Sequence, residues 1–382
     1  MKLKLTVIPT ILILFLTHLT ALAQLEYELK TFYQSGYEDN IFRSPSSYVD
    51  RDGVVFDEES LIESGAINGF GWDVELERNF NNVHRIRIEK SGWFQRYNEQ
   101  KSANQSDIDV ELKYDYDPDR RFELGAEFWG SKSNRIGTNV LGEELTRVFN
   151  YEEIGTKGYL QSGLWNNATS SLELGWRYRN FQNEPGIKSL TYTETAVSAD
   201  FIQEFGSKSF EQFLALEIEF EDKPYHERTA SDSGGYSGNP DYPLRHWRYL
   251  KGTLSYGLQL NNRWEFEPLL EFRHRSDMFQ NYFDYDQVGY GFKIGYDNRR
   301  VDITFDFSHK DRQYLVRTAP QASKPDPSLN YRYFRYSLDL EYQLFNALLI
   351  TGEYNLIQRR TNVSVNTMKT RRPYDFSSVL IN

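Results

Sequence analysis

The chain has 382 residues, no cysteine and a formal net charge of −11, and 16% of its residues are aromatic. The absence of cysteine excludes a disulfide scaffold, a thiolate metal site and a cysteine nucleophile, and the acidic balance argues against nonspecific binding to nucleic acid. A mean hydropathy of −0.66 is low for a chain with so many rings. A membrane-spanning β-barrel combines both properties, because only every second strand residue meets lipid.

The first 23 residues have the pattern of a secretory signal peptide. Two lysines lie within the first four residues, residues 7–16 form a short apolar run, and Ala21 and Ala23 supply small residues at the cleavage positions. We therefore expect a signal peptide at residues 1–23 and a mature chain at residues 24–382. No later segment approaches the ~20 apolar residues that a spanning helix needs, so a chain of this kind can cross a membrane only as a closed barrel.

A strand–turn–strand unit at residues 106–129 is the clearest repeating pattern. Ile108, Val110 and Leu112 alternate with charged residues, and after an Asp-Pro-Asp turn Phe122 and Leu124 alternate with Glu and Gly. Successive strand side chains point to opposite faces. One face of this hairpin is therefore apolar, and the other is charged.

The same unit recurs along the mature chain. The predicted strands cover 26–37, 66–80, 84–98, 106–116, 121–129, 149–165, 191–205 and 374–382, and further strands flank the turns at 166–167, 206–208, 261–262, 297–299 and 345–346. Longer loops are predicted at 38–65, 132–147, 223–244, 318–330 and 362–373. Short and long connections alternate, as in outer-membrane barrels with short periplasmic turns and long external loops. The predicted fold class is all-β, a single antiparallel transmembrane β-barrel of about 16 strands, or 14–18 if one hairpin is missed or invented.

Tryptophans lie near both ends of the predicted strands. Trp165 and Trp264 are beside short turns, whereas Trp93, Trp129 and Trp247 are near the long loops. We expect these rings to form the aromatic girdles of the two membrane interfaces. The alternative is a soluble all-β protein with an aromatic core, but its strands would be shorter, at about 5–6 residues.

A short motif follows the first predicted strand, with the sequence Gly36-Tyr37-Glu38-Asp39-Asn40-Ile41-Phe42-Arg43. It resembles the outer-membrane β-barrel families found beside polysaccharide or surface-protein export systems in Gram-negative bacteria. The resemblance implies a location in the cell outer membrane. The implied partners are outer-membrane lipid, periplasmic chaperones, the barrel-assembly machinery, and polysaccharide or a surface protein. The chain departs from such barrels at its end, because its last four residues, Val-Leu-Ile-Asn, lack the usual aromatic residue.

Charged residues on the predicted inward faces are the candidate functional residues. These pore-lining candidates are Glu123, Glu127, Arg177, Arg179, Glu217, Glu219, Glu265, Glu267, Glu271, Arg273, Asp302, Asp306, Arg335, Asp339 and Glu341. They could coat a water-filled pore, or they could pair with one another and fill the barrel. A barrel of about 16 strands favours an aqueous channel.

No catalytic or cofactor site is predicted. Ser308 and His309 are consecutive, so they point to opposite strand faces and cannot form a dyad, and no loop has the twelve-residue calcium pattern. We expect no enzyme activity, no cofactor and no metal. The first hypothesis is a channel or export conduit for small polar solutes or surface polysaccharide.

Two other functions are weighed against that channel. The second hypothesis is a surface-display barrel whose loops 38–65 and 223–244 bind glycan or protein through residues such as Tyr48 and Tyr225. The third is a barrel-embedded enzyme that modifies lipid. A gated high-affinity importer is not expected, because the first strand follows the cleavage site too closely for a plug domain.

Overall fold

The computed structural model describes most of the predicted mature chain. The described residues are 25–41, 48–49, 55–56, 63–81, 83–99, 101–118, 121–138, 144–165, 167–181, 190–207, 210–231, 239–260, 263–298, 300–319, 327–345, 348–363 and 374–381. The predicted signal peptide lies outside the described residues. No helix among them is long and apolar enough to cross a membrane.

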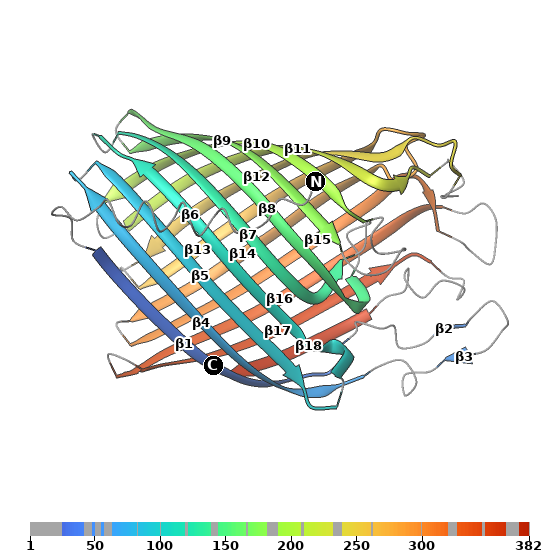
Figure 1. Ribbon diagram of the computed structural model, residues 1–382, viewed down its shortest axis with the longest axis horizontal. Coiled ribbons are helices and arrows are strands. Elements are labelled where there is room, and N and C mark those ends of the chain that lie inside the picture. Colours follow the sequence, from blue (N-terminus) through green and yellow to red (C-terminus); the bar gives the residue numbers. More distant parts are fainter. Residues whose placement is uncertain are drawn as a thin grey trace, which may run out of the picture.

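Sixteen antiparallel strands form one closed barrel, which confirms the predicted fold class (Figure 1). Each strand is hydrogen-bonded to its neighbours in the chain, and the first strand pairs with the last. The barrel strands are β1 (Leu25–Glu38), β4 (Gly65–Phe80), β5 (His84–Tyr97), β6 (Gln105–Tyr116), β7 (Phe122–Thr138), β8 (Glu144–Trp165), β9 (Ala168–Phe181), β10 (Tyr192–Ser207), β11 (Phe210–Thr229), β12 (Leu244–Leu260), β13 (Trp264–Asp277), β14 (Tyr285–Asn298), β15 (Val301–Thr318), β16 (Ser328–Phe345), β17 (Leu348–Thr361) and β18 (Tyr374–Ile381). Two further strands, β2 (Tyr48–Val49) and β3 (Val55–Phe56), pair in the connection after β1, and one 3-10 turn, η1 (Lys101–Ala103), precedes β6.

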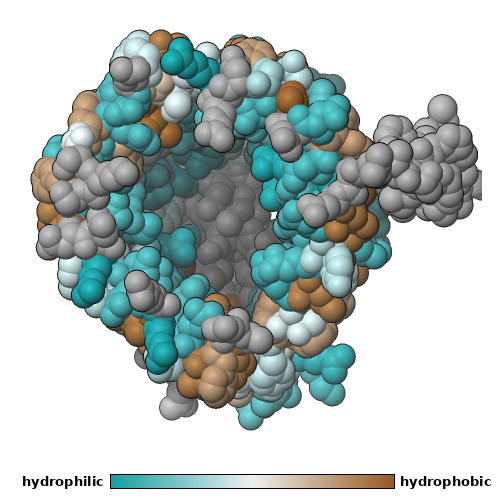
Figure 2. Space-filling view, turned by 90° about the vertical axis from the view of Figure 1, so that its left-hand side faces the viewer, coloured by the Kyte–Doolittle hydropathy of each residue, from teal (hydrophilic) through white to brown (hydrophobic). Residues whose placement is uncertain are grey.

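Two faces of the barrel wall differ in chemistry because of strand alternation. On β11, Leu214, Leu216 and Ile218 are exposed on the outer face, whereas Glu217 and Glu219 occupy the alternate, inward positions. Figure 2 shows the short-turn end, where hydrophilic residues surround a hollow and hydrophobic residues appear on the outside. A closed barrel with an apolar outer face satisfies its backbone polar groups internally and meets lipid with side chains alone.

Two predicted loops are shorter than the sequence suggested. The loop predicted at 132–147 is largely strand, because β7 continues to Thr138 and β8 begins at Glu144. The loop predicted at 223–244 is wrong over its first residues, because β11 continues to Thr229. Lys223 pairs with Trp247 in the ladder, and the register shifts only after Pro224, at the kind of irregular position that tolerates a proline.

The predicted aromatic girdle is confirmed only at the short-turn end. There, Trp165 and Trp264 are 60% and 48% exposed on the outer face. Trp93, Trp129 and Trp247 lie on the inward face instead, because their positions in β5, β7 and β12 alternate with the outward apolar residues. At the long-loop end, exposed rings such as Tyr37, Phe70 and Phe94 face outward.

Closure of the barrel depends on a short seam. β1 pairs with β4 along its whole length, but it pairs with β18 only from Ser35 to Glu38. Gly36 lies inside this seam, and a Cβ added there would be 2.2 Å from the carbonyl oxygen of Val379. The backbones of β1 and β18 cannot move apart to make room for it without breaking the few hydrogen bonds that close the barrel.

Gly36→Ala should therefore weaken closure. We expect the folded, heat-modifiable form to be lost at a lower temperature than in the unchanged protein, as measured by electrophoretic mobility after stepwise heating. Gly352→Ala on β17 is the matched control, because a Cβ there meets nothing within 4 Å. Equal effects of the two substitutions would show that the seam does not limit stability.

Leu216→Arg should impair insertion, because it places a charge on the lipid-facing side of β11 at a cost of about 2–4 kcal/mol near the bilayer midplane. Glu217→Arg, one residue along, should insert normally, because the side chain enters the hydrated lumen. Folding yield into lipid vesicles measures both variants. If both variants insert equally well, the assignment of lipid-facing and lumen-facing residues on β11 is wrong.

Candidate functional site

The inward face of the barrel holds the residues that the sequence singled out. The fifteen predicted pore-lining residues lie at strand positions that alternate with outward apolar residues on β7, β9, β11, β13, β15 and β16. That they line a conducting pore stays a prediction. Their positions define the site to be considered, which is the lumen wall.

Charge on this wall is sorted along the barrel axis. On β13, Glu265, Glu267 and Glu271 come first from the short turn, and Arg273 and Arg275 follow toward the long connection. The same order, acidic before basic, occurs in Glu173 to Arg179 on β9, Glu217 to Lys223 on β11, Asp302 to Arg312 on β15, Glu341 to Arg335 on β16 and Glu353 to Arg359 on β17. On these six strands the lumen wall is therefore acidic near the short turns and basic near the long connections.

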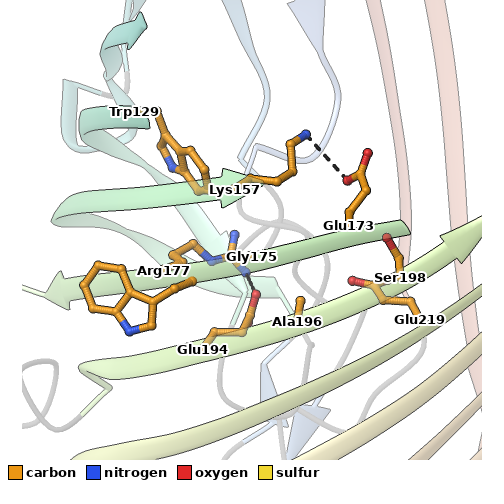
Figure 3. A pocket seen from close by; sticks show the side chains of 10 residues that line it. Trp129, Lys157, Glu173, Gly175, Arg177, Glu194, Ala196, Ser198 and Glu219 are labelled. Atoms are coloured by element: carbon orange, nitrogen blue, oxygen red, sulfur yellow. Dashed lines mark hydrogen bonds and ion pairs between the residues drawn. The ribbon is translucent and has the colours of Figure 1, made fainter. Parts of the chain in front are cut away.

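A network of buried charges crosses β8 to β11, and Figure 3 shows one pair of it, Arg177 with Glu194. Glu194 on β10 pairs with the Arg177 guanidinium, and its Oε2 lies 2.6 Å from Lys223 Nζ. Arg179 Nε donates to Glu153 Oε2 at 2.6 Å, and Trp129 Nε1 donates to Glu153 Oε1 at 3.1 Å. Glu194 thus lies within ion-pair distance of two cations, and Glu153 accepts hydrogen bonds from an arginine and an indole, which offsets the cost of taking these charges out of water.

Beside this network lies a recess of about 180 Å³ in the lumen wall (Figure 3). Lys157 on β8 enters it, with its Nζ 3.3 Å from Glu127 and 3.7 Å from Glu173. Glu219, which also lines the recess, pairs with Lys251 at 2.9 Å. The recess is therefore walled by alternating charges that already have partners.

Among the residues that the structure describes, ion pairs run around the wall and do not cross the lumen. Lys310 on β15 pairs with Glu271 on β13 at 2.7 Å, and this is the widest separation between strands among the ion pairs of the described residues. The other pairs join residues of one strand or of adjacent strands, as Lys251 does with Glu219. Charges of the described residues consequently reinforce the wall without bridging it.

Guanidinium groups and aromatic rings alternate near the long connections of β12 to β17, and we call this set the arginine–aromatic belt. Its members are Arg245, Trp247, Arg275, Phe283, Tyr285, Arg312, Tyr314, Arg317, Tyr331, Tyr333 and Arg359. The Arg275 Cζ lies 4.3 Å from the Trp247 ring centroid and 4.4 Å from that of Tyr285. Arg312 Cζ lies 4.5 Å from the Tyr285 centroid. Stacking of this kind stabilises a cation that has left water.

Two belt arginines have incomplete polar contacts. Arg275 and Arg245 are each 1% exposed. Arg275 Nε donates to the Phe283 carbonyl at 2.8 Å, and Arg245 Nη2 donates to Ser231 Oγ at 3.1 Å. Arg245 Nε and Nη1 and Arg275 Nη2 have no hydrogen-bond partner. Neither residue forms an ion pair with a carboxylate of the described chain, so the belt carries buried positive charge without a full complement of acceptors.

Acidic groups near the belt are few. Asp277 ends β13, and Asp284 lies in the connection to β14, where its carboxylate accepts a hydrogen bond from the Asp277 amide. Burial is the largest influence on Asp284 and raises the pKa of its carboxyl above its usual value. No group of three or more acidic or histidine residues in the described part of the chain is placed to hold a metal ion.

Most of the belt lies outside the set of residues predicted from the sequence. Arg275 lies two residues after Arg273, and Arg312 lies six residues after Asp306, so both fall on the inward face of the same strand. The two-residue alternation, followed to the end of each strand, is the signal that predicts them. Tyr225, which was assigned to a recognition loop, is 5% exposed and packs edge-on against Trp247 at 5.3 Å. Interpreting Tyr225 as a surface residue was therefore wrong.

No family model matches the sequence, and no curated protein does. Solved structures with a similar fold include OccAB1 of Acinetobacter baumannii, with a TM-score of 0.50, 8% identity, and coverage of 93% of this chain and 95% of that chain. OccK5 (OpdH) of Pseudomonas aeruginosa has a TM-score of 0.43, 11% identity and coverage of 93% and 97%. The ferric citrate transporter FecA has a TM-score of 0.47, 9% identity and coverage of 91% and 63%, so this chain spans less than two thirds of it. At these identities the similarity is one of fold, and the fold is an outer-membrane β-barrel.

Glu194→Gln should destabilise the folded protein by about 3–5 kcal/mol, because it leaves Lys223 and Arg177 without their buried partner. Glu152→Gln is the control, because its pair with Lys132 is exposed, at 50% and 70% of the two side chains, and such pairs contribute about 0–1 kcal/mol. Urea unfolding from lipid vesicles, followed by tryptophan fluorescence, gives both values. Equal losses would contradict a stabilising role for the buried network.

Proposed function

We propose that the protein is an outer-membrane channel for small polar solutes. The observation that carries this proposal is the arrangement of charge on the lumen wall. Ion pairs of the described residues join strands no more than two apart, as between Lys310 and Glu271. Side chains that pair along the wall leave the centre of a wide barrel to water, whereas side chains that pair across it would fill the barrel.

Strand number supports the same function. Barrels of eight strands fill their interior with side chains, and barrels of about 16 strands leave room for an aqueous channel. The space-filling view of the short-turn end is hollowed, with hydrophilic residues around the opening (Figure 2). Charged groups beside such a path set which ions and solutes pass.

We further propose that the barrel has no catalytic role. Ser308 faces inward, whereas the ring of His309 lies on the outer face, with its centroid 4.9 Å from that of Tyr290 and 4.7 Å from that of Phe334. The surface-display alternative depends on loop side chains such as Tyr236, which lies outside the described residues. Polysaccharide is an alternative cargo for the same conduit.

Conductance of the refolded protein in a planar lipid bilayer tests the proposal, and the absence of native cysteine makes a sharp version possible. Glu217→Cys should give discrete conductance steps that fall when a charged, water-soluble thiol reagent is added, because the new thiol faces the aqueous path. Leu216→Cys is the control, and its steps should not respond. A silent bilayer from folded, heat-modifiable protein would overturn the channel function.

A further inference from the structure

We propose that the arginine–aromatic belt, together with the neighbouring Arg273, binds the oxyanion group of a solute, a carboxylate or a phosphate, through Arg273, Arg275 and Arg312. The inference rests on the proposed channel function, which it deepens by naming a class of solute. The site is a place on the inner wall near the long connections, where a solute entering from that end meets a concentration of guanidinium groups.

The three arginines lie on both sides of β14. Arg275 is the ladder partner of Tyr285, and Gln287, two residues further along β14, pairs with Arg273 on one side and Arg312 on the other. The guanidiniums of Arg275 and Arg312 both stack on the Tyr285 ring, at 4.4 and 4.5 Å. Stacking thus brings Arg275 and Arg312 to one ring, and the register places Arg273 beside them, opposite Gln287, with its own guanidinium over the Tyr249 ring.

The charges around this group leave it positive. Glu221, which is 6% exposed, pairs with Lys251, and Glu271 pairs with Lys310 at 2.7 Å. Neither Arg273 nor Arg275 has a carboxylate within ion-pair distance among the described residues, and Arg273 Nε and Arg275 Nη2 have no hydrogen-bond partner. Asp277 and Asp284 lie at the end of the same hairpin, where Asp284 is engaged by a backbone amide.

Geometry favours an oxyanion as the missing partner. A guanidinium whose flat faces are covered by rings can still donate from its edge, and that planar fork matches the paired oxygens of a carboxylate or a phosphate. Arg273 is only half-buried, with its Cζ 4.7 Å from the Tyr249 ring centroid, so its edge connects the buried belt to the lumen. A neutral solute would leave these donors unsatisfied and so would bind more weakly.

Axial sorting of charge supports a capture site rather than a uniformly anion-selective pore. On the short-turn side of the belt, the first acidic residues of the lumen wall are Glu271 on β13 and Asp306 on β15. An anionic group is therefore favoured at the belt and disfavoured beyond it. Binding is confined to one level of the lumen, which makes saturable block of the current the expected behaviour.

Arg273→Gln tests the site, because Arg273 is the least buried of the three and its replacement is the least disruptive to folding. Arg332→Gln is the matched control, since it removes one positive charge from the same end of the barrel at an outward position of β16, where Arg332 is exposed and pairs with Asp311 at 3.6 Å. Succinate and inorganic phosphate are the anionic probes, and glucose is the neutral one. We measure block of the potassium chloride current in bilayers and the melting temperature of the folded protein in detergent.

Succinate, phosphate or both should block the current of the unchanged protein and of Arg332→Gln and should raise their melting temperatures, with glucose inert. Arg273→Gln should need about tenfold more anion for half-block, the loss expected for one charge-assisted hydrogen bond. Block by succinate alone assigns a carboxylate, and block by phosphate alone assigns a phosphate. Equal block of both variants, or none in a conducting channel, would overturn the site.

Failure of the site and failure of the channel can be told apart. A non-conducting protein whose melting temperature still rises with anion, and does so less in Arg273→Gln, would overturn the channel function and retain the binding site. A conducting protein with no anion response would retain the channel and overturn the site. Loss of folding in Arg273→Gln would be visible as lost heat modifiability, and Arg273→Lys then replaces it, because it keeps the charge and removes the fork.

Discussion

Every other property of this molecule depends on the requirement that backbone polar groups be paired inside a bilayer. Lipid offers no hydrogen bonds, so the sheet must close on itself. Closure here is achieved by sixteen antiparallel strands and ends at a seam of four residue pairs between β1 and β18. The seam is short beside the full-length pairing of β1 with β4, which makes it the place where steric tolerance is smallest.

Closure also decides where the charges go. Once a strand is fixed in the wall, its side chains alternate between lipid and lumen, and the polar half of the composition is concentrated inside. Because the partners of a charged residue are then on neighbouring strands, the ion pairs form lateral networks such as that of Glu194 with Arg177 and Lys223. The wall is stiffened by electrostatics while the space within it is left unbridged.

The free-energy cost of burying arginine near the long connections is offset mainly by contacts with aromatic rings. Arg275 lies between Trp247 and Tyr285, and Arg312 stacks on the same tyrosine. Ring faces stabilise the cations without supplying acceptors for their N–H groups. Arg245 and Arg275 therefore differ from the cations of the β8–β11 network, each of which meets a carboxylate, and this difference in counter-charge among the described residues is what points to a ligand.

Sequence by itself determined the fold. Two-residue alternation, as in Leu214 to Phe220, and the regular exchange of short and long connections were enough to give an all-β barrel of sixteen strands and the inward positions of all fifteen candidate residues, because both follow from local backbone geometry. Strand ends were less certain. At Lys223 and Pro224, turn-forming residues suggested a loop, and ladder pairing with β12 extended the strand instead.

Only the tertiary structure decided which charges meet. Arg275 and Tyr285 are ten positions apart in the chain and face one another because of the β13–β14 register, and Arg312 joins them from β15. The neighbours of Trp247, which include Arg275 on β13 and Tyr225 on β11, also depend on strand register. Alternation fixes the face on which a side chain lies, but pairing between strands fixes its neighbours, and the candidate site is made of neighbours.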